Sequence, residues 1–344
     1  MTFTNRPTVR INSITDLLAL IPYLLGFHPV SSLVLMAIDD DGRILIAGRL
    51  DLPTPGEPPG PLHTALDKAA AKINTHGGAG VVLAGYGPAE QVELAVTAAT
   101  GALHSVGIPI RAALRVAEGR FWRLDCDDPV GCPPQGTPFD PADSPVTAAA
   151  VYAGLIALPD RDALAATLAP VTGPARDGMV AATAAACAFF TQLLDAAAPE
   201  AGNHPDAVLD TRLGRGLQAA ARTYLTQAQH RYRARQPVDD EHAATLTVLL
   251  ELPSLREFAA RRTTGEAWQI QMWTDLVRRA EPEFTAAPAT LLTLCALQAG
   301  NGALADIAVH RALDVDPDHR LAQLLAQAIA AGIDPDTITA LLAG

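Results

Sequence analysis

The chain has 344 residues, of which 49% are hydrophobic and 18% charged, and its formal net charge is −12. This length exceeds one ordinary domain and allows a sizeable core, while the acidic balance argues against nucleic acid or an anionic membrane as a partner of the whole chain. No uncharged apolar run is long enough to span a membrane, no signal peptide is visible, and four cysteines do not make a disulfide framework. We therefore expect a cytoplasmic protein with reduced thiols.

Residues 13–53, around which the chain is organised, predict one helix followed by a hairpin. Ser13 and Asp16 are typical of a helix start, because a hydroxyl and a carboxylate complement the free N–H groups of the first turn. Pro22 lies inside this helix and predicts a kink or a break, and Gly26 suits its left-handed end. The hairpin comprises two strands at residues 33–38 and 43–52 and an acidic turn at 39–42.

Helices and strands alternate through the rest of the front half. Apolar periodicity predicts helices at 62–75 and 88–105 and strands at 80–87, 108–116 and 120–126. Strands separated by helices favour parallel pairs covered by helices, and the two hairpins add antiparallel pairs. We expect residues 1–126 to form an α/β domain with a mixed sheet.

The back half predicts helices throughout. Residues 127–145 are rich in proline, glycine and aspartate, which is typical of a linker or of a loop that wraps around a domain. Residues 146–344 then predict an all-α helical domain, and its short loops imply antiparallel neighbours. Small residues near its end favour tetratricopeptide-like packing, although about one and a half units are visible. The expected helices are 146–158, 161–169, 176–197, 205–235, 239–250, 254–262, 266–280, 286–299, 303–314, 320–331 and 335–342.

Four segments carry a family resemblance: Leu25-Gly26-Phe27-His28-Pro29, Arg49-x-Asp51-Leu52-Pro53, Cys132-Pro133-Pro134-Gln135-Gly136-Thr137-Pro138 and Gly300-Asn301-Gly302-Ala303-Leu304-Ala305. In this order they resemble the domain-of-unknown-function family 4192, which is found mostly in actinobacteria. The likeness spans nearly the whole chain. The family pattern has two adjacent cysteines where this chain has Gly131 and Cys132. The resemblance implies no activity, cofactor or fold.

The corner between the first helix and the first strand is the first candidate site. Gly26, His28, Ser31 and Ser32 lie there, and their hydroxyls and imidazole can form a ligand-binding lip. The alternative is that the serines satisfy loop backbone groups and that His28 packs or is solvated. The sequence contains no nucleophile elbow, so a serine nucleophile lacks its usual setting.

Two further pairs are candidate ligand contacts. Arg49 and Asp51 face the same side of their strand and can clamp an anionic or amide-bearing ligand, or form an exposed pair of little energetic value. Gly85 and Gly87 follow a strand and open a helix, where backbone N–H groups can bind an anion. The alternative for the glycines is a plain strand-to-helix turn.

Metal and cofactor sites are not expected. The turn Asp39-Asp40-Asp41-Gly42 resembles a fragment of a calcium loop, but it lacks the downstream glutamate, and a hairpin turn explains it better. Cys126 and Cys132 do not have zinc-ligand spacing. A transient disulfide between these two is an alternative of low weight.

Arginines gather on the helical half despite the acidic average. They are Arg212, Arg215, Arg222, Arg231, Arg233, Arg235, Arg256, Arg261, Arg262, Arg278 and Arg279, interleaved with Tyr224, Tyr232, Trp268 and Trp273. Such a surface can bind an acidic partner or nucleic acid. The alternative is solvated helix faces whose arginines pair with glutamate and aspartate.

No reactive side-chain cluster unites these candidates, so we expect a non-catalytic interaction or regulatory scaffold rather than an enzyme. Protein is the expected partner, with a small-ligand site in the α/β domain. The alternative is an enzyme, such as a hydrolase, with its site at the carboxyl ends of the sheet strands. Nucleic-acid binding through the arginine-rich helices is a weaker alternative.

Overall fold

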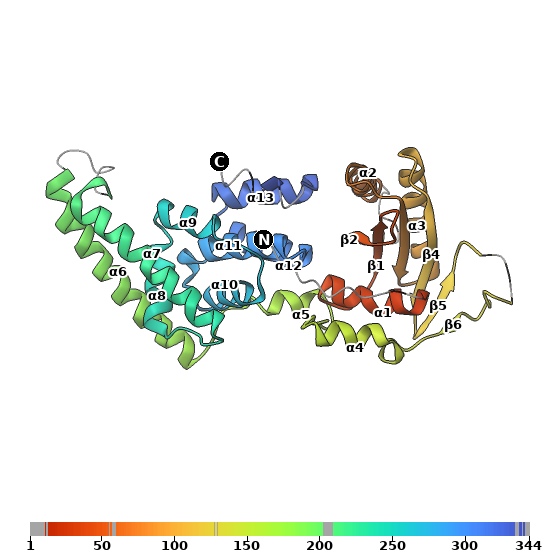
Figure 1. Ribbon diagram of the computed structural model, residues 1–344, viewed down its shortest axis with the longest axis horizontal. Coiled ribbons are helices and arrows are strands. Elements are labelled where there is room, and N and C mark those ends of the chain that lie inside the picture. Colours follow the sequence, from red (N-terminus) through yellow and green to blue (C-terminus); the bar gives the residue numbers. More distant parts are fainter. Residues whose placement is uncertain are drawn as a thin grey trace. The chain divides into compact units, whose positions relative to one another are not determined.

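The structure is a computed structural model that describes residues 11–340 except 12, 55, 57–59, 127, 129, 202–208, 334–336 and 339. The chain divides into two compact units, Met1–Leu164 and Ala165–Gly344. The first contains a sheet with helices, and the second is built from helices (Figure 1). The expected order of an α/β part followed by a helical part is confirmed.

One mixed sheet forms the centre of the first unit. Its strands are β1 (Ser32–Ile38), β2 (Ile44–Asp51), β3 (Gly80–Tyr86), β4 (Ile110–Ala117), β5 (Arg120–Arg123) and β6 (Thr137–Pro138). Their order in the sheet is β2-β1-β3-β4-β5-β6. β3 and β4 are parallel, and the other neighbouring pairs are antiparallel. The parallel pair is joined by a helix and the antiparallel pairs β1–β2 and β4–β5 by turns, as the alternation of elements predicts.

Both faces of the middle strands are buried, which their unbroken apolar sequence predicts. Leu33 and Leu83 belong to a core cluster with Leu66 and Val92, which lie on α2 (Gly60–Thr75) and α3 (Ala89–Ser105). Met36 points to the opposite face and is also fully buried. Each side of the sheet therefore contributes to the core.

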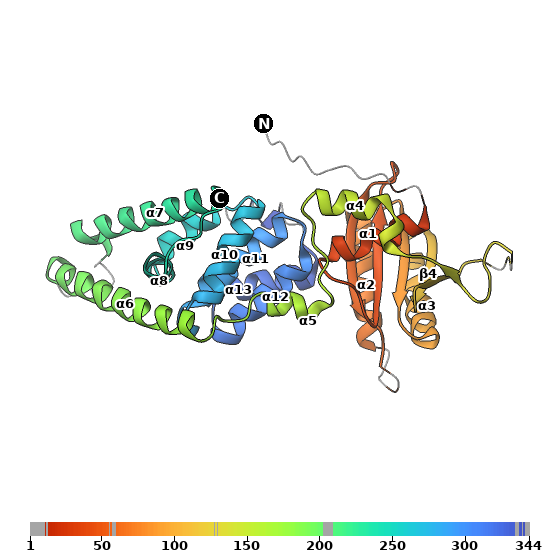
Figure 2. The same cartoon turned by 90° about the horizontal axis from the view of Figure 1, so that it is seen from below.

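Two helices pack against each other beside the sheet, α1 (Ile14–Leu25) and α4 (Pro145–Tyr152), and lie side by side in Figures 1 and 2. The Ser144 hydroxyl, at the start of α4, donates to the buried Asp16 carboxylate of α1 at 2.7 Å. Ser13 caps α1 through the Asp16 N–H, as expected. The helix continues through Pro22, so of the expected kink or break the break does not occur.

The segment 127–145, expected to be a linker or a wrapping loop, belongs to the first unit and packs on it as a loop. It contributes β6 and the short 3-10 helix η1 (Pro141–Asp143). Trp122 Nε1 donates to the Pro134 carbonyl at 2.9 Å, and Arg120 donates to the Gly136 carbonyl at 3.0 Å. These contacts tie the segment to β5, because a side chain on the strand reaches each carbonyl.

The boundary between the units also differs from the expected one at residue 145. Helix α4 packs on α1, and Leu158 pairs with Phe27 in a parallel bridge. The division therefore follows Leu164, inside α5 (Arg161–Ala166). The sequence predicted that α4 belongs to the helical domain, because helices follow it, but α4 packs on α1 of the first unit.

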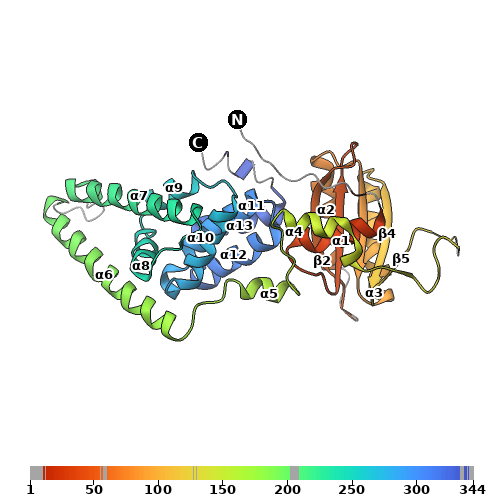
Figure 3. The ribbon, with the colours of Figure 1, turned by 60° about the horizontal axis from the view of Figure 1, so that its bottom comes forward.

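The second unit consists of paired helices (Figure 3). They are α6 (Pro174–Ala201), α7 (Arg212–Arg233), α8 (Asp240–Leu249), α9 (Pro253–Ala260), α10 (Ala267–Arg279), η3 (Pro282–Phe284), α11 (Ala286–Gln298), α12 (Gly302–Val315) and α13 (Arg320–Ala331). Consecutive helices from α10 to α13 pack on one another, with Leu292 and Ala308 fully buried. The helices expected at 205–235 and 335–342 lie partly outside the described residues.

A buried polar network joins three of these helices. Arg279 of α10 donates to Asp275 at 3.0 Å, to Asp240 at 2.7 Å and to the Val238 carbonyl at 2.9 Å. The Tyr232 hydroxyl of α7 bonds to the same Asp275 carboxylate. Burial lowers the pKa of Arg279, but the two carboxylates raise it more, so the guanidinium stays charged.

Candidate functional site

The corner after α1 is held by its backbone. Gly26 ends α1 with a φ of 83°, a conformation that favours glycine. The Gly26 carbonyl accepts the Leu158 N–H at 2.9 Å, and the His28 N–H donates to the Leu158 carbonyl at 2.8 Å. Phe27 between them is buried, whereas His28 is exposed. The corner is thus anchored by Phe27 and presents His28 to solvent.

Ser31 continues this corner in an unusual conformation. Its φ is 45°, a backbone conformation that residues other than glycine rarely adopt. The Ser31 carbonyl accepts the Leu52 N–H at 2.9 Å, which ties the corner to the end of β2. A Cβ on Gly87 would lie 2.8 Å from a Leu52 methyl group, so the lack of a side chain at Gly87 allows Leu52 to pack there. Three separate segments therefore meet at Ser31.

The side chains at the neighbouring strand ends bond to one another. Arg49 Nε donates to the Ser32 hydroxyl at 2.7 Å, and the other end of its guanidinium pairs with Asp51 at 2.5 Å. Ser32 is fully buried, and its hydroxyl donates to the Val30 carbonyl at 2.6 Å. The Ser32 hydroxyl is thus used as both donor and acceptor. Asp51 is 79% exposed, so the outer part of the pair faces water.

The strand register explains why these residues meet. Ser32 at the start of β1 lies opposite Asp51 at the end of β2 and opposite Tyr86 at the end of β3. Opposite residues of an antiparallel pair share one face. Of the predicted site residues, Ser31, Ser32, Arg49, Asp51, Gly85 and Gly87 lie at this end of the three strands, and Gly26 and His28 lie on the corner that leads into it. Ligand binding there stays a prediction.

The Gly85–Pro88 turn joins β3 to α3 and is closely packed. A Cβ on Gly85 would lie 2.3 Å from a Val92 methyl group, so this glycine allows α3 to pack on the strand. The Gly87 carbonyl accepts a hydrogen bond from Arg115 at 3.1 Å. Glu90 lies in the first turn of α3, where its carboxylate opposes a bound anion. Both glycines therefore have a packing role, and anion binding at this turn stays a prediction.

Tyr86 is a feature of this corner that we did not predict. Its hydroxyl is buried and has no hydrogen-bond partner among the described residues. Burial raises the pKa of Tyr86 well above its ordinary value, so the phenol stays protonated. A buried hydroxyl without a partner is unusual and costs stability. The sequence signal was a tyrosine between two glycines at the end of an apolar strand.

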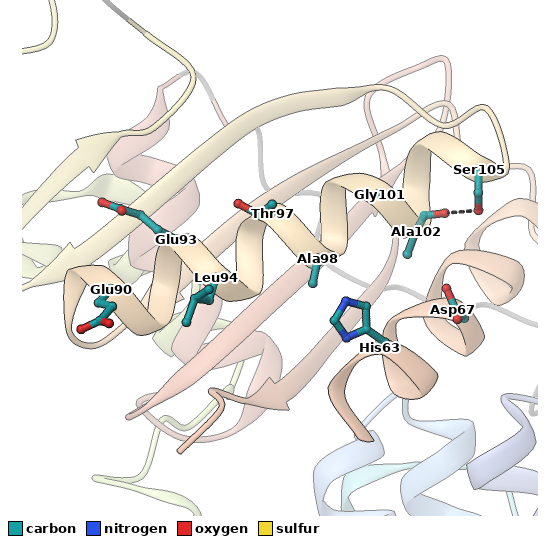
Figure 4. Close-up of a pocket in the computed structure, with 10 residues that line it drawn as sticks. All are labelled: His63, Asp67, Glu90, Glu93, Leu94, Thr97, Ala98, Gly101, Ala102 and Ser105. Atoms are coloured by element: carbon teal, nitrogen blue, oxygen red, sulfur yellow. Dashed lines mark hydrogen bonds between the residues drawn. The ribbon is translucent and has the colours of Figure 1, made fainter. Parts of the chain in front are cut away.

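A groove lies between α2 and α3. It measures about 680 Å³ and is lined by His63, Asp67, Glu90, Glu93, Leu94, Thr97, Ala98, Gly101, Ala102 and Ser105. Figure 4 shows the residues of α2 facing a stripe of side chains along α3. No local sequence pattern predicts this groove, because it depends on the distance between two helices.

The described part of the chain contains no group of three or more histidine, cysteine, aspartate or glutamate residues that could hold a metal ion. The acidic turn is a hairpin turn, in which Asp39 accepts the Arg43 N–H at 2.8 Å and Gly42 has a φ of 77°. Burial raises the pKa of the Cys295 thiol to about 12, so this cysteine is unreactive.

Cys126 and Cys132 form a disulfide. The expectation of four reduced thiols is therefore wrong for this pair, while Cys187 and Cys295 are free. Both cysteines of the pair lie in the segment that extends from β5, and both are half-buried. A sequence separation of six residues allows a bond wherever the chain turns back, and the turn itself was not visible in the sequence.

Several arginines of the helical unit are already engaged by its own side chains. Arg233 lies over the Trp268 ring and near Glu266, and Arg261 pairs with Glu257 at 2.6 Å. The guanidinium of Arg279 is buried in the network described above. These contacts fit the alternative in which the arginines lie on solvated helix faces and pair with acidic side chains. They weaken the case for an arginine-lined binding surface.

Helix α6 has a composition that we did not single out. Residues Pro174–Pro199 are long and apolar enough to cross a membrane by length and composition alone, and 11% of the apolar window is buried. The helix also contains Arg176, which pairs with Glu281 at 2.6 Å. The absence of a membrane span stays a prediction.

These features define a protein with a mixed α/β unit and a helical unit that follows it. The family model of the domain of unknown function DUF4192 matches residues 15–336. The chain therefore belongs to this family, and the resemblance found in the sequence is confirmed. No curated protein and no solved structure matches the chain.

Proposed function

We propose that this protein is a non-catalytic interaction or regulatory protein, with a ligand-binding α/β unit and a helical unit that serves as a scaffold. The proposal rests on the strand-end corner. The Ser32 hydroxyl is bonded to Arg49 and to the Val30 carbonyl, and Arg49 is bonded to Asp51. A serine nucleophile needs a base within hydrogen-bond reach, and Ser32 has an arginine in that place.

The same corner supports a small-ligand site. Asp51 and the outer part of the Arg49 guanidinium face solvent, so a carboxylate or amide can replace Asp51 with little cost, because exposed ion pairs contribute little stability. His28 and Ser31 are exposed beside the same strand ends. A planar anion is the ligand type that suits a guanidinium.

Two measurements test this proposal. The purified chain should show no turnover on a broad panel of ester, amide and phosphoester substrates. Acetate, phosphate and a dipeptide should be titrated against wild-type protein and Arg49→Met, with Arg43→Met as the control, because Arg43 also pairs with an aspartate two residues away. Turnover that Ser31→Ala or His28→Ala abolishes would refute a non-catalytic role.

An enzyme with its site at the carboxyl ends of the strands is the second candidate. Two observations favour it, the left-handed conformation of Ser31 and the unpartnered Tyr86 hydroxyl, since strained backbone and unsatisfied polar groups cluster at active sites. Loss of turnover in both Tyr86→Phe and Ser31→Ala would support this candidate. Equal turnover in both variants and wild type would remove it.

Nucleic-acid binding through the arginine-bearing helices is a weaker candidate. Its support is the number of arginines on α7 and α10, but ion pairs and aromatic rings within the unit already engage several of them. A gel-shift series over rising salt tests it, because phosphate contacts give affinity a steep salt dependence. Binding that is absent or independent of salt would dismiss this candidate.

A cytoplasmic location also remains a proposal. It follows from the sequence expectation, whereas a Cys126–Cys132 disulfide is more typical of oxidising compartments. Alkylation of the protein in intact cells, followed by mass spectrometry, measures the redox state of this pair. A pair that is fully oxidised in cells would contradict the cytoplasmic assignment.

A further inference from the structure

The groove between α2 and α3 combines an acidic rim with an apolar floor. Asp67, Glu90 and Glu93 provide three carboxylates, and no lysine or arginine is among the described residues that line the groove. Within the described part of the chain, none of these three carboxylates has a hydrogen-bond or ion-pair partner. A cationic partner can therefore pair with them without displacing an existing bond.

The floor of the groove is a stripe along one side of α3. Leu94, Ala98, Gly101 and Ala102 recur at intervals of three or four residues, so they lie on one face of the helix. Leu94 is 59% exposed, although it is a large apolar side chain. A Cβ on Gly101 would meet no atom within 4 Å, so the groove is open above this position. Small residues beside an exposed leucine leave room for a partner's apolar side chains.

We propose that this groove is the docking surface for a partner protein that presents a basic amphipathic helix. The partner's lysine or arginine side chains pair with Asp67, Glu90 and Glu93, and its apolar side chains cover Leu94 and the small residues near Gly101. This is the helix-in-groove mode of recognition. The inference rests on the proposed interaction role and specifies the class of partner.

Charge decides which occupant fits. An acidic peptide, a nucleic acid or an anionic membrane would place negative charge against three carboxylates. A purely apolar helix would bury Leu94 but leave the rim unpaired. A helix with an apolar face and a cationic flank satisfies both parts of the groove. The carboxylates of α3 lie in its first half and the small residues in its second half, so the cationic flank covers the start of α3.

The test uses the full-length chain and a synthetic probe, a fluorescent helical peptide of about 16 residues built from leucine, alanine and lysine. We expect binding by fluorescence anisotropy and a weakening of several-fold when salt rises from about 50 to about 300 mM, because exposed charges are screened. A matched peptide with glutamate in place of lysine should not bind. Equal binding of both peptides would overturn the inference.

Gly101→Leu is the central variant. It fills the groove at an open position within a helix, and leucine has a higher helix propensity than glycine, so the fold should be retained. Gly216→Leu is the matched control, since Gly216 lies inside α7 and a Cβ there also meets no atom within 4 Å. We expect Gly101→Leu to weaken peptide binding about tenfold or more and Gly216→Leu to leave it within about twofold. Equal affinities for the two variants would overturn the inference.

Charge reversal gives an independent test. Asp67→Lys/Glu93→Lys reverses one carboxylate on each helix and should weaken binding about tenfold or more. Glu118→Lys/Asp314→Lys reverses the same number of charges at exposed positions outside the groove and should have little effect. Equal losses in both would mean that the peptide responds to net charge alone, which would contradict a site in the groove.

Two further outcomes separate this inference from the proposed function. Concentration-dependent self-association that Gly101→Leu abolishes would assign the groove to a second copy of the chain and overturn a foreign partner. Catalytic turnover would refute the proposed function whether or not the peptide binds. If the peptide does not bind in the groove and the protein shows no turnover, the groove inference is wrong. The proposed function then rests on the strand-end ligand site alone.

Discussion

Arg49 in the α/β unit and Arg279 in the helical unit each bind more than one oxygen, but their surroundings differ. Arg279 has a side chain that is 10% exposed and bonds to Asp240 of α8 and to Asp275 of α10, which is 28% exposed and also bonds to Tyr232 of α7. Arg49 joins two neighbouring strands; its own side chain is 18% exposed, but its carboxylate partner is 79% exposed. The buried network is therefore structural, whereas the strand-end pair can exchange its partner, because the cost of removing a charge partner depends on burial.

The largest effect is expected from Arg279→Met. This change leaves the half-buried Asp275 carboxylate and the Tyr232 hydroxyl without their cationic neighbour, which should lower the free energy of unfolding by about 3 kcal/mol. Arg261→Met is the control, because the Arg261–Glu257 pair is exposed and should contribute about 0.5 kcal/mol or less. Urea unfolding followed by circular dichroism measures both. Equal losses would mean that burial does not separate the two networks.

The next effect concerns the covalent link of the α/β unit. Cys126→Ser/Cys132→Ser removes a disulfide between residues six positions apart. The loop-entropy relation gives a loss of about 2 kcal/mol for a loop this short. Thermal unfolding with and without dithiothreitol measures it, and reduction of wild type should reproduce the variant. A variant as stable as oxidised wild type would show that the link does not restrain the unit.

A smaller, pH-dependent effect is expected at the start of α13. His319 Nδ1 accepts the Ala322 N–H at 3.2 Å, which requires a neutral ring. Burial lowers the pKa of His319, Arg256 lowers it further, and Asp316 raises it in part, so the pKa in the folded chain lies below its ordinary value. The stabilisation is then fully present above the unfolded pKa of about 6.5 and is lost as pH falls through the folded pKa.

The cap contributes about 1 kcal/mol, and His319→Asn provides the test. Asparagine caps a helix equally well and does not titrate. The difference in unfolding free energy between wild type and His319→Asn should therefore change between about pH 7 and pH 5, in favour of the variant at low pH. A difference that is constant across this range would contradict the cap.

The smallest effect is expected at the strand ends. Arg49→Met removes one hydrogen bond to Ser32 and one exposed ion pair, for a loss of about 1 kcal/mol. A double-mutant cycle with Ser32→Ala isolates the Arg49–Ser32 bond and should give a coupling of about 1 kcal/mol or less. A loss as large as that of Arg279→Met would mean that the pair at the strand ends is also a structural network.

The arrangement of the front half was largely predictable from the sequence. The apolar runs that form β1 and β3 have no polar alternation, and both strands are buried on both faces. Gly26 and Gly42 adopt the left-handed conformations that their positions predict. The predicted site residues also lie together, because the hairpin turn and the strand lengths determine which residues stand opposite one another.

Other features depend on contacts between distant segments, which no local pattern specifies. The proline-rich segment 127–145 had the composition of a linker, yet Trp122 and Arg120 bond to its carbonyls. Helix α4 looked like the first helix of the helical part, and its packing on α1 places it in the first unit. The Cys126–Cys132 bond likewise requires a turn that brings the two sulfur atoms together.

The sequence by itself determined the element types, the mixed sheet, the helical second half and the family. These follow from periodicity, turn residues and motif order, which act over a few residues. The tertiary structure alone decided that the Ser32 hydroxyl accepts a hydrogen bond from Arg49. It also decided that the Tyr86 hydroxyl is buried without a partner among the described residues, and that α2 and α3 leave an acidic groove between them. Those features depend on distances between elements, because burial and charge act through space rather than along the chain.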